Sequence, residues 1–232
     1  MTLNINQPGR TRQLATVPHG SLMIHEIYRS IQGEGSHVGW PCVFVRTSMC
    51  NLRCKYCDTT EAFSPGTIRN ISSIIEQVKG LQCPLVEITG GEPLLQPGTL
   101  DLASQLCDHG YRVLIETSGA IPIKAIDFRV VRILDIKTPG SGESAANYWP
   151  NMEWLRKTDE VKFVLTSHQD FLWSIDVVNE FDLDSRVSVW FSPSWGQVSY
   201  RDLAAWVLES RRNVRVGMQL HKFIWGPSER SV

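Results

Sequence analysis

Short apolar segments alternate with amphipathic segments along most of this chain, and that alternation restricts the fold more than any other feature. Segments of the first kind are β-branched or apolar and bounded by turn residues, which predicts strands at Cys42 to Arg46, Leu85 to Thr89, Arg112 to Glu116, Arg132 to Ile136, Val161 to Leu165 and Val187 to Phe191. Segments of the second kind carry apolar residues three and four positions apart, which predicts helices at Ile71 to Lys79, Gly98 to His109, His168 to Glu180 and Tyr200 to Arg211. The sequence therefore indicates an α/β fold with a parallel sheet.

The positions of the polar motifs favour a partial barrel over a doubly wound sheet. No G-x-G-x-x-G motif follows the first predicted strand, and the polar motifs come at strand ends, where α/β barrels carry their active sites. We therefore expect a partial (β/α)6-type barrel. Because 232 residues suit one core, we expect a single domain over residues 21–232, preceded by a flexible N-terminal extension over residues 1–20.

Charge and hydropathy argue for a small-molecule enzyme of the cytoplasm. The 23 Lys and Arg residues nearly balance the 24 Asp and Glu residues, so the chain has no strong field to attract nucleic acid or anionic lipid. We find neither a signal peptide nor an apolar run long enough to span a membrane. The sequence thus predicts no nucleic-acid partner and no membrane association.

Cys50, Cys54 and Cys57 form a C-x3-C-x2-C motif directly after the first predicted strand. Three thiolates can ligate three irons of a [4Fe-4S] cluster, and without a nearby fourth cysteine one iron stays open to another ligand. The other cysteines, at positions 42, 83 and 107, lie in or beside apolar segments, and we expect them to be small buried hydrophobic residues.

Two other interpretations of the motif stay open on spacing alone. A structural zinc site could be completed by a distant histidine such as His25 or His37. The three cysteines are also spaced as on one face of a helix. Zinc ligands usually come in two separated pairs, and polar residues surround these thiols, so the iron–sulfur interpretation is favoured.

Polar motifs also end the next three predicted strands. Thr89 to Pro93 contains paired glycines that let the backbone approach a ligand, although the same residues suit a tight turn. Glu116 to Gly119 offers a carboxylate and hydroxyls that bind a ligand or cap the next segment, and Asp135 to Glu143 reads as a loop. Four consecutive strands delivering polar motifs to one rim predict a single site there.

The cysteine motif, with the aromatic Tyr56 before its last cysteine, resembles the signature of the radical S-adenosylmethionine (SAM) superfamily. Across nearly the whole chain the sequence resembles one family within it, the 7-carboxy-7-deazaguanine synthases. That resemblance rests on Gln32-Gly33-Glu34-Gly35, Gly39 and Pro41, Phe44-Val45-Arg46, the cysteine loop continuing into Asp58-Thr59, Thr89 to Pro93, Glu116 to Gly119, Asp135 to Gly140 and Gln219-Leu220-His221-Lys222.

The resemblance implies a lyase of queuosine and deazapurine biosynthesis, which converts 6-carboxy-5,6,7,8-tetrahydropterin to 7-carboxy-7-deazaguanine with loss of ammonia. It implies a [4Fe-4S] cluster on the three cysteines, SAM, a Mg²⁺ ion on Thr59, a homodimer, and an electron donor such as flavodoxin or ferredoxin. The pterin-binding residues it implies are Ile31, Gln32, Gly33, Arg46, Thr89, Gln219, His221 and Pro227. The SAM-binding residues it implies are Tyr56, Cys57, Asp58, Gly91, Glu92, Glu116, Ser118, Lys137 and Pro139.

Two segments depart from the family pattern, the extension over residues 1–20 and the tail from Ser228 to Val232. Two rival functions also remain. A glycyl-radical-enzyme activase shares the cysteine spacing, but Asp135 to Gly140 and Gln219 to Lys222 argue against it. A zinc-binding interaction module without catalysis would keep the cysteines and no iron.

Overall fold

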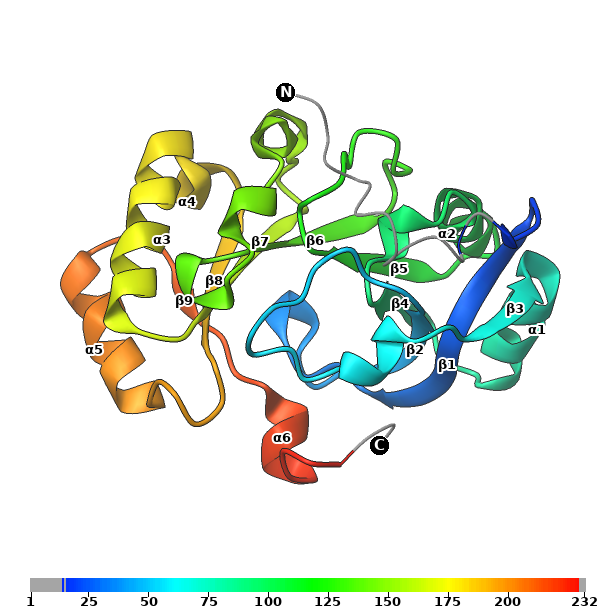
Figure 1. Ribbon diagram of the computed structural model, residues 1–232, viewed down its shortest axis with the longest axis horizontal. Coiled ribbons are helices and arrows are strands. Elements are labelled where there is room, and N and C mark those ends of the chain that lie inside the picture. The colour runs from blue at the N-terminus through cyan, green and yellow to red at the C-terminus, as the bar shows by residue number, and fades with distance from the viewer. Residues whose placement is uncertain (1–13, 15, 230–232) are drawn as a thin grey trace.

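The computed structural model describes residue 14 and residues 16–229. The predicted N-terminal extension falls mostly outside these residues, as does the end of the C-terminal tail. Within them the strands form one nine-stranded sheet in the order β3-β1-β2-β4-β5-β6-β7-β8-β9 (Figure 1). The strands are β1 (Ser21–Ile31), β2 (Pro41–Thr47), β3 (Thr67–Asn70), β4 (Leu85–Gly90), β5 (Arg112–Thr117), β6 (Val131–Ile136), β7 (Glu160–Leu165), β8 (Ser188–Pro193) and β9 (Arg215–Val216).

The six predicted strands are β2, β4, β5, β6, β7 and β8, and every neighbouring pair among them is parallel. Strand β1 runs antiparallel to both β2 and β3 and forms an edge region that sequence analysis did not predict. Polar residues such as His25, Glu26 and Arg29 interrupt the apolar pattern of β1, and its register shifts between Ile24 and Glu26. The opposite edge strand is β9, so the sheet curves without closing, which confirms a partial barrel.

The α-helices are α1 (Ile71–Gly80), α2 (Gly98–Asp108), α3 (His168–Phe181), α4 (Leu183–Arg186), α5 (Tyr200–Ser210) and α6 (Leu220–Ile224). All four predicted helices are present, with ends within one residue of prediction. Three of them start at a capping side chain that accepts a backbone N–H bond: Asn70 for α1, Ser167 for α3 and Ser199 for α5. Figure 1 shows α1 and α2 beside one end of the sheet and α3 to α5 beside the other.

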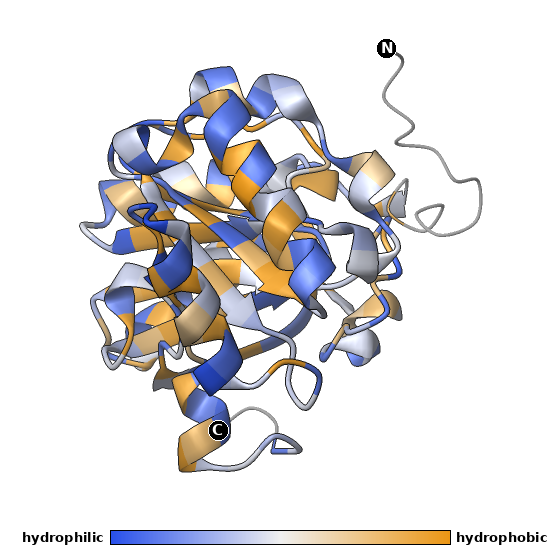
Figure 2. Cartoon of the chain, turned by 90° about the vertical axis from the view of Figure 1, so that its left-hand side faces the viewer, coloured by the Kyte–Doolittle hydropathy of each residue, from blue (hydrophilic) through white to orange (hydrophobic). Residues whose placement is uncertain are grey.

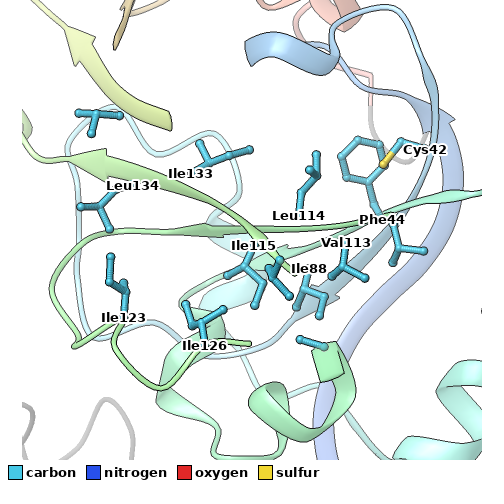
Figure 3. Close-up of a cluster of buried hydrophobic side chains, with 14 of the residues drawn as sticks. Cys42, Phe44, Ile88, Val113, Leu114, Ile115, Ile123, Ile126, Ile133 and Leu134 are labelled. Atoms are coloured by element: carbon cyan, nitrogen blue, oxygen red, sulfur yellow. The ribbon is translucent and has the colours of Figure 1, made fainter. Parts of the chain in front are cut away.

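Two crossovers do without an α-helix. The connection from β5 to β6 is a loop, and the one from β6 to β7 runs through short 3-10 turns such as Trp149–Trp154. Apolar side chains of these connections still cover the sheet: Ile123 and Ile126 belong to the same core cluster as Leu134 and Ile115, and Figure 3 shows Ile123 below Leu134 and Ile126 below Ile115. The chain therefore closes its core in this region with loops.

Side chains of the parallel strands alternate between two different environments, because successive residues of a strand point to opposite faces. One face is apolar and buried against the helices and connections, with Val45, Ile88, Ile115, Leu134 and Phe163 among its members. Figure 2 shows the result, with hydrophobic strands inside and helices that carry hydrophobic and hydrophilic stripes. The other face is largely polar and lines a cavity. One face of the sheet therefore forms the core, and the opposite face carries the candidate site. No helix among the described residues is both long and apolar enough to cross a membrane.

A buried ion pair at the amino ends of β6 and β7 joins these two strands. Asp159 accepts hydrogen bonds from the backbone N–H of Arg132 at 3.1 Å and from its Nε at 2.9 Å, and the two side chains are 0% and 3% exposed. Arg156 also donates its backbone N–H to Asp159 at 2.7 Å. The Asp159 carboxylate thus binds both arginines, and through the Arg132 backbone it also fixes the start of β6.

We predict that Asp159→Ala lowers the free energy of unfolding by about 3–5 kcal/mol, because it leaves the buried Arg132 guanidinium without a counter-ion. Chemical denaturation followed by circular dichroism measures this. The matched control is Asp108→Ala, which breaks the exposed pair with Arg129 and should cost less than about 1 kcal/mol. Equal effects of the two substitutions would contradict the assignment.

Candidate active site

A cavity of about 650 Å³ lies on the polar face of the sheet. Inward-facing residues of β2, β4, β5, β6, β7 and β8 form one wall, and the loop carrying Cys50, Cys54 and Cys57 forms another. Residues of β1 and of the C-terminal segment, including Tyr28 and His221, complete the lining. The cavity thus collects the carboxyl ends of the strands, as the position of the polar motifs predicts.

The cysteine loop is not helical, so the interpretation of these residues as a helix face is wrong. The Arg53 N–H donates to Glu143 Oε1 at 2.6 Å, and the Lys55 N–H donates to Ser141 O at 3.0 Å. These bonds tie the loop to the segment after β6. All three thiols line the cavity, although Cys50 is buried and the other two are half-buried.

Burial controls the ionisation of these thiols. It raises the pKa of Cys50 to about 12 and that of Cys54 to about 11, and it also raises the pKa of Cys57. The free thiols are therefore neutral near pH 7. Loading with a metal group requires thiolates and would release protons.

In the part of the chain that the structure describes, no three His, Cys, Asp or Glu side chains are grouped to hold one ion, and this holds for the three motif cysteines as well. His25 lines the cavity, but His37 lies 3.9 Å from Glu160 instead. Cys42 and Cys83 are buried as predicted, whereas Cys107 is only partly buried because it sits near the end of α2. None of these three cysteines belongs to the cavity wall.

The glycines after β4 allow a close approach to the cysteine loop. A Cβ on Gly91 would lie 2.1 Å from Met49 O and 3.1 Å from Cys50 Cβ, so any larger residue would push the loop away. The Glu92 N–H also donates to Met49 O at 2.9 Å. Residue 91 is therefore glycine for packing reasons as well as for access.

Glu92 and Pro139 lie outside the cavity wall, in contrast to the other predicted site residues. The Glu92 side chain is fully buried and accepts hydrogen bonds from Thr117 Oγ1 at 2.8 Å, from the Ser118 N–H at 2.7 Å and from the Leu94 N–H at 3.0 Å. The carboxylate oxygens of Glu92 are thus already hydrogen-bonded to protein groups. Glu92 orients Ser118, which does line the cavity.

Lys162 of β7 is the centre of a charged cluster inside the cavity. Its Nζ lies 2.9 Å from Glu34 Oε2 and 3.7 Å from Asp135 Oδ2, and it donates a hydrogen bond to Glu116 Oε1. Burial lowers the pKa of Lys162, but the three carboxylates outweigh burial and raise it well above its ordinary value. For Glu116 burial raises the pKa, and Lys162 reverses this so that the net direction is downward.

Glu87 behaves differently from its neighbours. Its side chain is buried on β4, it accepts a hydrogen bond from Gln32 Nε2, and burial together with the nearby Glu116 raises its pKa well above the ordinary value. The cavity therefore holds carboxylates of both kinds: Glu87 is prone to protonation, whereas Glu116 is kept ionised by Lys162.

The loop after β1 and the C-terminal segment pack against each other at the cavity. The Leu220 N–H donates to Gly33 O at 2.9 Å, and Gln219 Nε2 donates to Glu34 Oε1 at 3.0 Å. The His221 ring occupies the space that a Cβ on Gly33 would need, with its Nδ1 only 2.1 Å from that point. Burial lowers the pKa of His221, which favours the neutral ring.

Arg46 and Lys222 form ion pairs near the two ends of the site. Arg46 Nε donates to Glu26 Oε1 at 2.7 Å, and its Nη2 donates to Tyr28 Oη at 3.1 Å. Lys222 Nζ donates to Asp58 Oδ2 at 2.8 Å. Burial raises the pKa of Asp58, but the Lys222 ammonium outweighs it and holds that pKa well below its usual range.

The structure brings nearly all predicted site residues to this one cavity: Ile31, Gln32, Gly33, Arg46, Cys50, Cys54, Tyr56, Cys57, Asp58, Thr59, Thr89, Gly91, Glu116, Ser118, Lys137, Gln219, His221 and Pro227. Sequence analysis gave no role to Glu26, Tyr28, Glu34, Glu87, Asp135 and Lys162, which also line it. A usable signal existed for Glu87 and Lys162, because a charged residue inside an otherwise apolar predicted strand indicates a polar inner face.

Comparisons with known proteins agree with this geometry. Residues 44–130 match the model of the Radical SAM superfamily. A 7-carboxy-7-deazaguanine synthase from Chlorobaculum tepidum is 45% identical over 214 residues, which cover 91% of this chain and 97% of that relative. The corresponding protein from Koribacter versatilis is 42% identical, over 91% of this chain and all of the relative.

A solved structure extends the likeness to three dimensions. The crystal structure of QueE from Escherichia coli superposes with a TM-score of 0.72 at 22% identity, over 90% of this chain and 98% of that one, and shows the shared fold. Identity above two fifths across almost the full length of the relatives settles the family. The chain belongs to the 7-carboxy-7-deazaguanine synthase family of radical SAM enzymes.

Proposed function

We propose that this enzyme converts 6-carboxy-5,6,7,8-tetrahydropterin to 7-carboxy-7-deazaguanine with loss of ammonia, in queuosine or deazapurine biosynthesis. One observation carries the proposal: the C-x3-C-x2-C thiols and the Gln32-Gly33-Glu34-Gly35 loop, which lie on either side of β2 in the sequence, line the same cavity. The two relatives reported above align with 91% of this chain and are named for that synthase activity, and neither is named as an activase.

The cavity suits a [4Fe-4S] cluster on Cys50, Cys54 and Cys57. Three thiols reach it without a fourth cysteine among the described residues of its wall, which leaves one iron for SAM. When bound, the cluster supplies the electron that cleaves SAM. The protein's own contribution is to hold the three sulfurs through the Gly91 contact and the bonds from Arg53 and Lys55.

The SAM side of the cavity is the part around Tyr56, Ser118, Asp135 and Lys137. Lys137 Nζ pairs with Asp135 Oδ2 at 2.9 Å, and its charge is suited to a carboxylate. Among the described residues, Asp135 Oδ1 and Tyr56 Oη are buried without a hydrogen-bond partner. Buried polar atoms left in this way favour a bound polar ligand. We assign Cys57, Asp58, Gly91 and Glu116 to the same side, with Glu92 and Pro139 acting from behind the wall.

The pterin side is formed by the loop after β1, by Arg46 and by the C-terminal segment. The Arg46 guanidinium suits the substrate carboxylate, because it can donate two parallel hydrogen bonds to it. Ile31, Gln32 and Gly33 would line the opposite flank, and Thr89, Gln219, His221 and Pro227 would complete the pocket. The buried Glu87 beside Gln32 adds a group that can exchange a proton there.

We propose Thr59 as a ligand of a Mg²⁺ ion. Mg²⁺ prefers oxygen donors and completes its shell with substrate and water, so few protein ligands are needed. Thr59 Oγ1 donates to Asp58 Oδ1 at 3.1 Å and lines the cavity beside the cysteine loop. Held there, the ion would supply positive charge for an oxygen of the substrate.

The remaining proposals concern organisation and partners. We propose a single catalytic domain over residues 21–232 that acts as a homodimer in the cytoplasm, receives electrons from a flavodoxin or ferredoxin, and needs neither nucleic acid nor membrane. The six cysteines are all free, which suits a reducing compartment.

Enzyme loaded with its cluster under anaerobic conditions, and supplied with reductant, SAM and the carboxytetrahydropterin, should form 7-carboxy-7-deazaguanine detectable by mass spectrometry. Omission of Mg²⁺ should lower the rate. Cleavage of SAM without this product would refute the proposed substrate, and stoichiometric zinc in place of iron would refute the cluster.

We predict that Cys54→Ala abolishes SAM cleavage, because an iron of the cluster loses its thiolate. The matched substitution Cys107→Ala should leave cleavage intact, since Cys107 lies on α2 away from the cavity wall. Formation of 5′-deoxyadenosine measures both. Equal activities of the two variants would contradict the ligand assignment.

We predict that Gly91→Ala reduces cluster loading, because its methyl group would displace the backbone of Met49 and Cys50 at a cost of about 1–3 kcal/mol. Iron per chain and visible absorbance after reconstitution report the loading. Gly80→Ala is the control, since a Cβ there meets no atom within 4 Å. Full loading of the Gly91 variant would show that the loop tolerates the shift.

A further inference from the structure

The charged cluster around Lys162 joins segments that are distant in sequence. Glu34 belongs to the loop after β1, Glu116 ends β5, and Asp135 lies on β6, while Lys162 itself lies on β7. The Lys162 side chain is only 10% exposed, and the three carboxylate side chains are between 11% and 25% exposed. An ammonium in this position offsets the repulsion of three carboxylates that share one cavity.

The partners of these carboxylates belong to different halves of the cavity. Glu34 also accepts a hydrogen bond from Gln219 Nε2, so it joins the loop after β1 to the C-terminal segment, both of which are assigned to the pterin. Asp135 also pairs with Lys137 at 2.9 Å, on the side assigned to SAM. A continuous chain of polar contacts therefore runs from Gln219 through Glu34, Lys162 and Asp135 to Lys137.

We infer that Lys162 is a positioning residue that couples the pterin half of the cavity to the SAM half, so that each ligand strengthens binding of the other. The inference rests on the proposed function for the assignment of the two halves. Its physical basis is that a ligand on one half restricts a carboxylate bound to Lys162. The second ligand then meets groups that are already ordered, and less conformational entropy is lost on its binding.

The coupling requires a charged lysine, and the cavity keeps it charged. Removing the ammonium would leave Glu34, Glu116 and Asp135 to repel one another, and the Glu34 side chain would lose its ion pair with β7. A lysine with a purely structural role would change stability but would leave the two binding events as dependent on each other as before. The two roles are therefore distinguished by the coupling factor, which is the factor by which the pterin lowers the dissociation constant of SAM.

The test measures the dissociation constant of SAM on anaerobic holoenzyme with the cluster oxidised, so that SAM is not cleaved. Titrations are run with and without saturating 6-carboxy-5,6,7,8-tetrahydropterin, on wild type, Lys162→Met, Lys162→Arg, Glu34→Gln and the surface control Lys79→Met. The pterin should tighten SAM binding about 5-fold or more in wild type and in the control. The factor should fall toward one in Lys162→Met and Glu34→Gln and recover partly in Lys162→Arg, which keeps the charge.

Several outcomes would overturn the inference. The inference is wrong if the pterin does not change the affinity of wild type for SAM. It is also wrong if the pterin tightens SAM binding as much in Lys162→Met as in wild type. If Lys162→Met does not fold, the Glu34→Gln variant replaces it: the inference is wrong if the pterin tightens SAM binding in this variant as much as in wild type. Failure of the proposed function looks different, because wild type would then bind SAM but not the pterin at all.

Discussion

The organisation of this protein depends on the strict alternation of side chains along its parallel strands. On one face Val45, Ile88, Ile115 and Phe163 pack against helices and connections and form the core. On the other face Arg46, Glu87, Glu116, Asp135 and Lys162 line a cavity within the same sheet. Burying charges so close to the core is tolerated only because each finds a partner, and Lys162 meets three carboxylates at once.

The open edge of the sheet determines what closes the site. A complete barrel would fill its interior with side chains, whereas here the loop after β1, the cysteine loop and the C-terminal segment surround the space. These three pieces touch each other through Leu220 and Gly33, and through Lys222 and Asp58. A shift of one loop therefore moves the residues it contacts in the others. Such contacts are what coupling between two ligands requires.

The parallel framework could be read from the sequence because its signals are local. A short apolar run such as Leu85 to Thr89 is enough to indicate a strand. A capping residue such as Asn70 in front of an amphipathic segment is enough to indicate the start of a helix. Strand β1 was not predicted because its register shifts and because polar residues such as His25 and Glu26, which line the cavity, interrupt its apolar pattern. Glu92 shows what a motif alone leaves out: the motif points to a ligand, whereas in the structure its oxygens accept hydrogen bonds from Thr117 and Ser118 at the end of β5.

The parallel α/β framework, the three cysteines of the cluster motif and the family can all be recognised from residue types and spacing along the chain. The contacts of Lys162 with Glu34, Glu116 and Asp135, and of His221 with Gly33, become visible only in three dimensions. Contacts between residues on different strands and loops depend on the curvature of the sheet and on the path of the loops. Those are set by packing of the whole chain, and no short stretch of sequence records them.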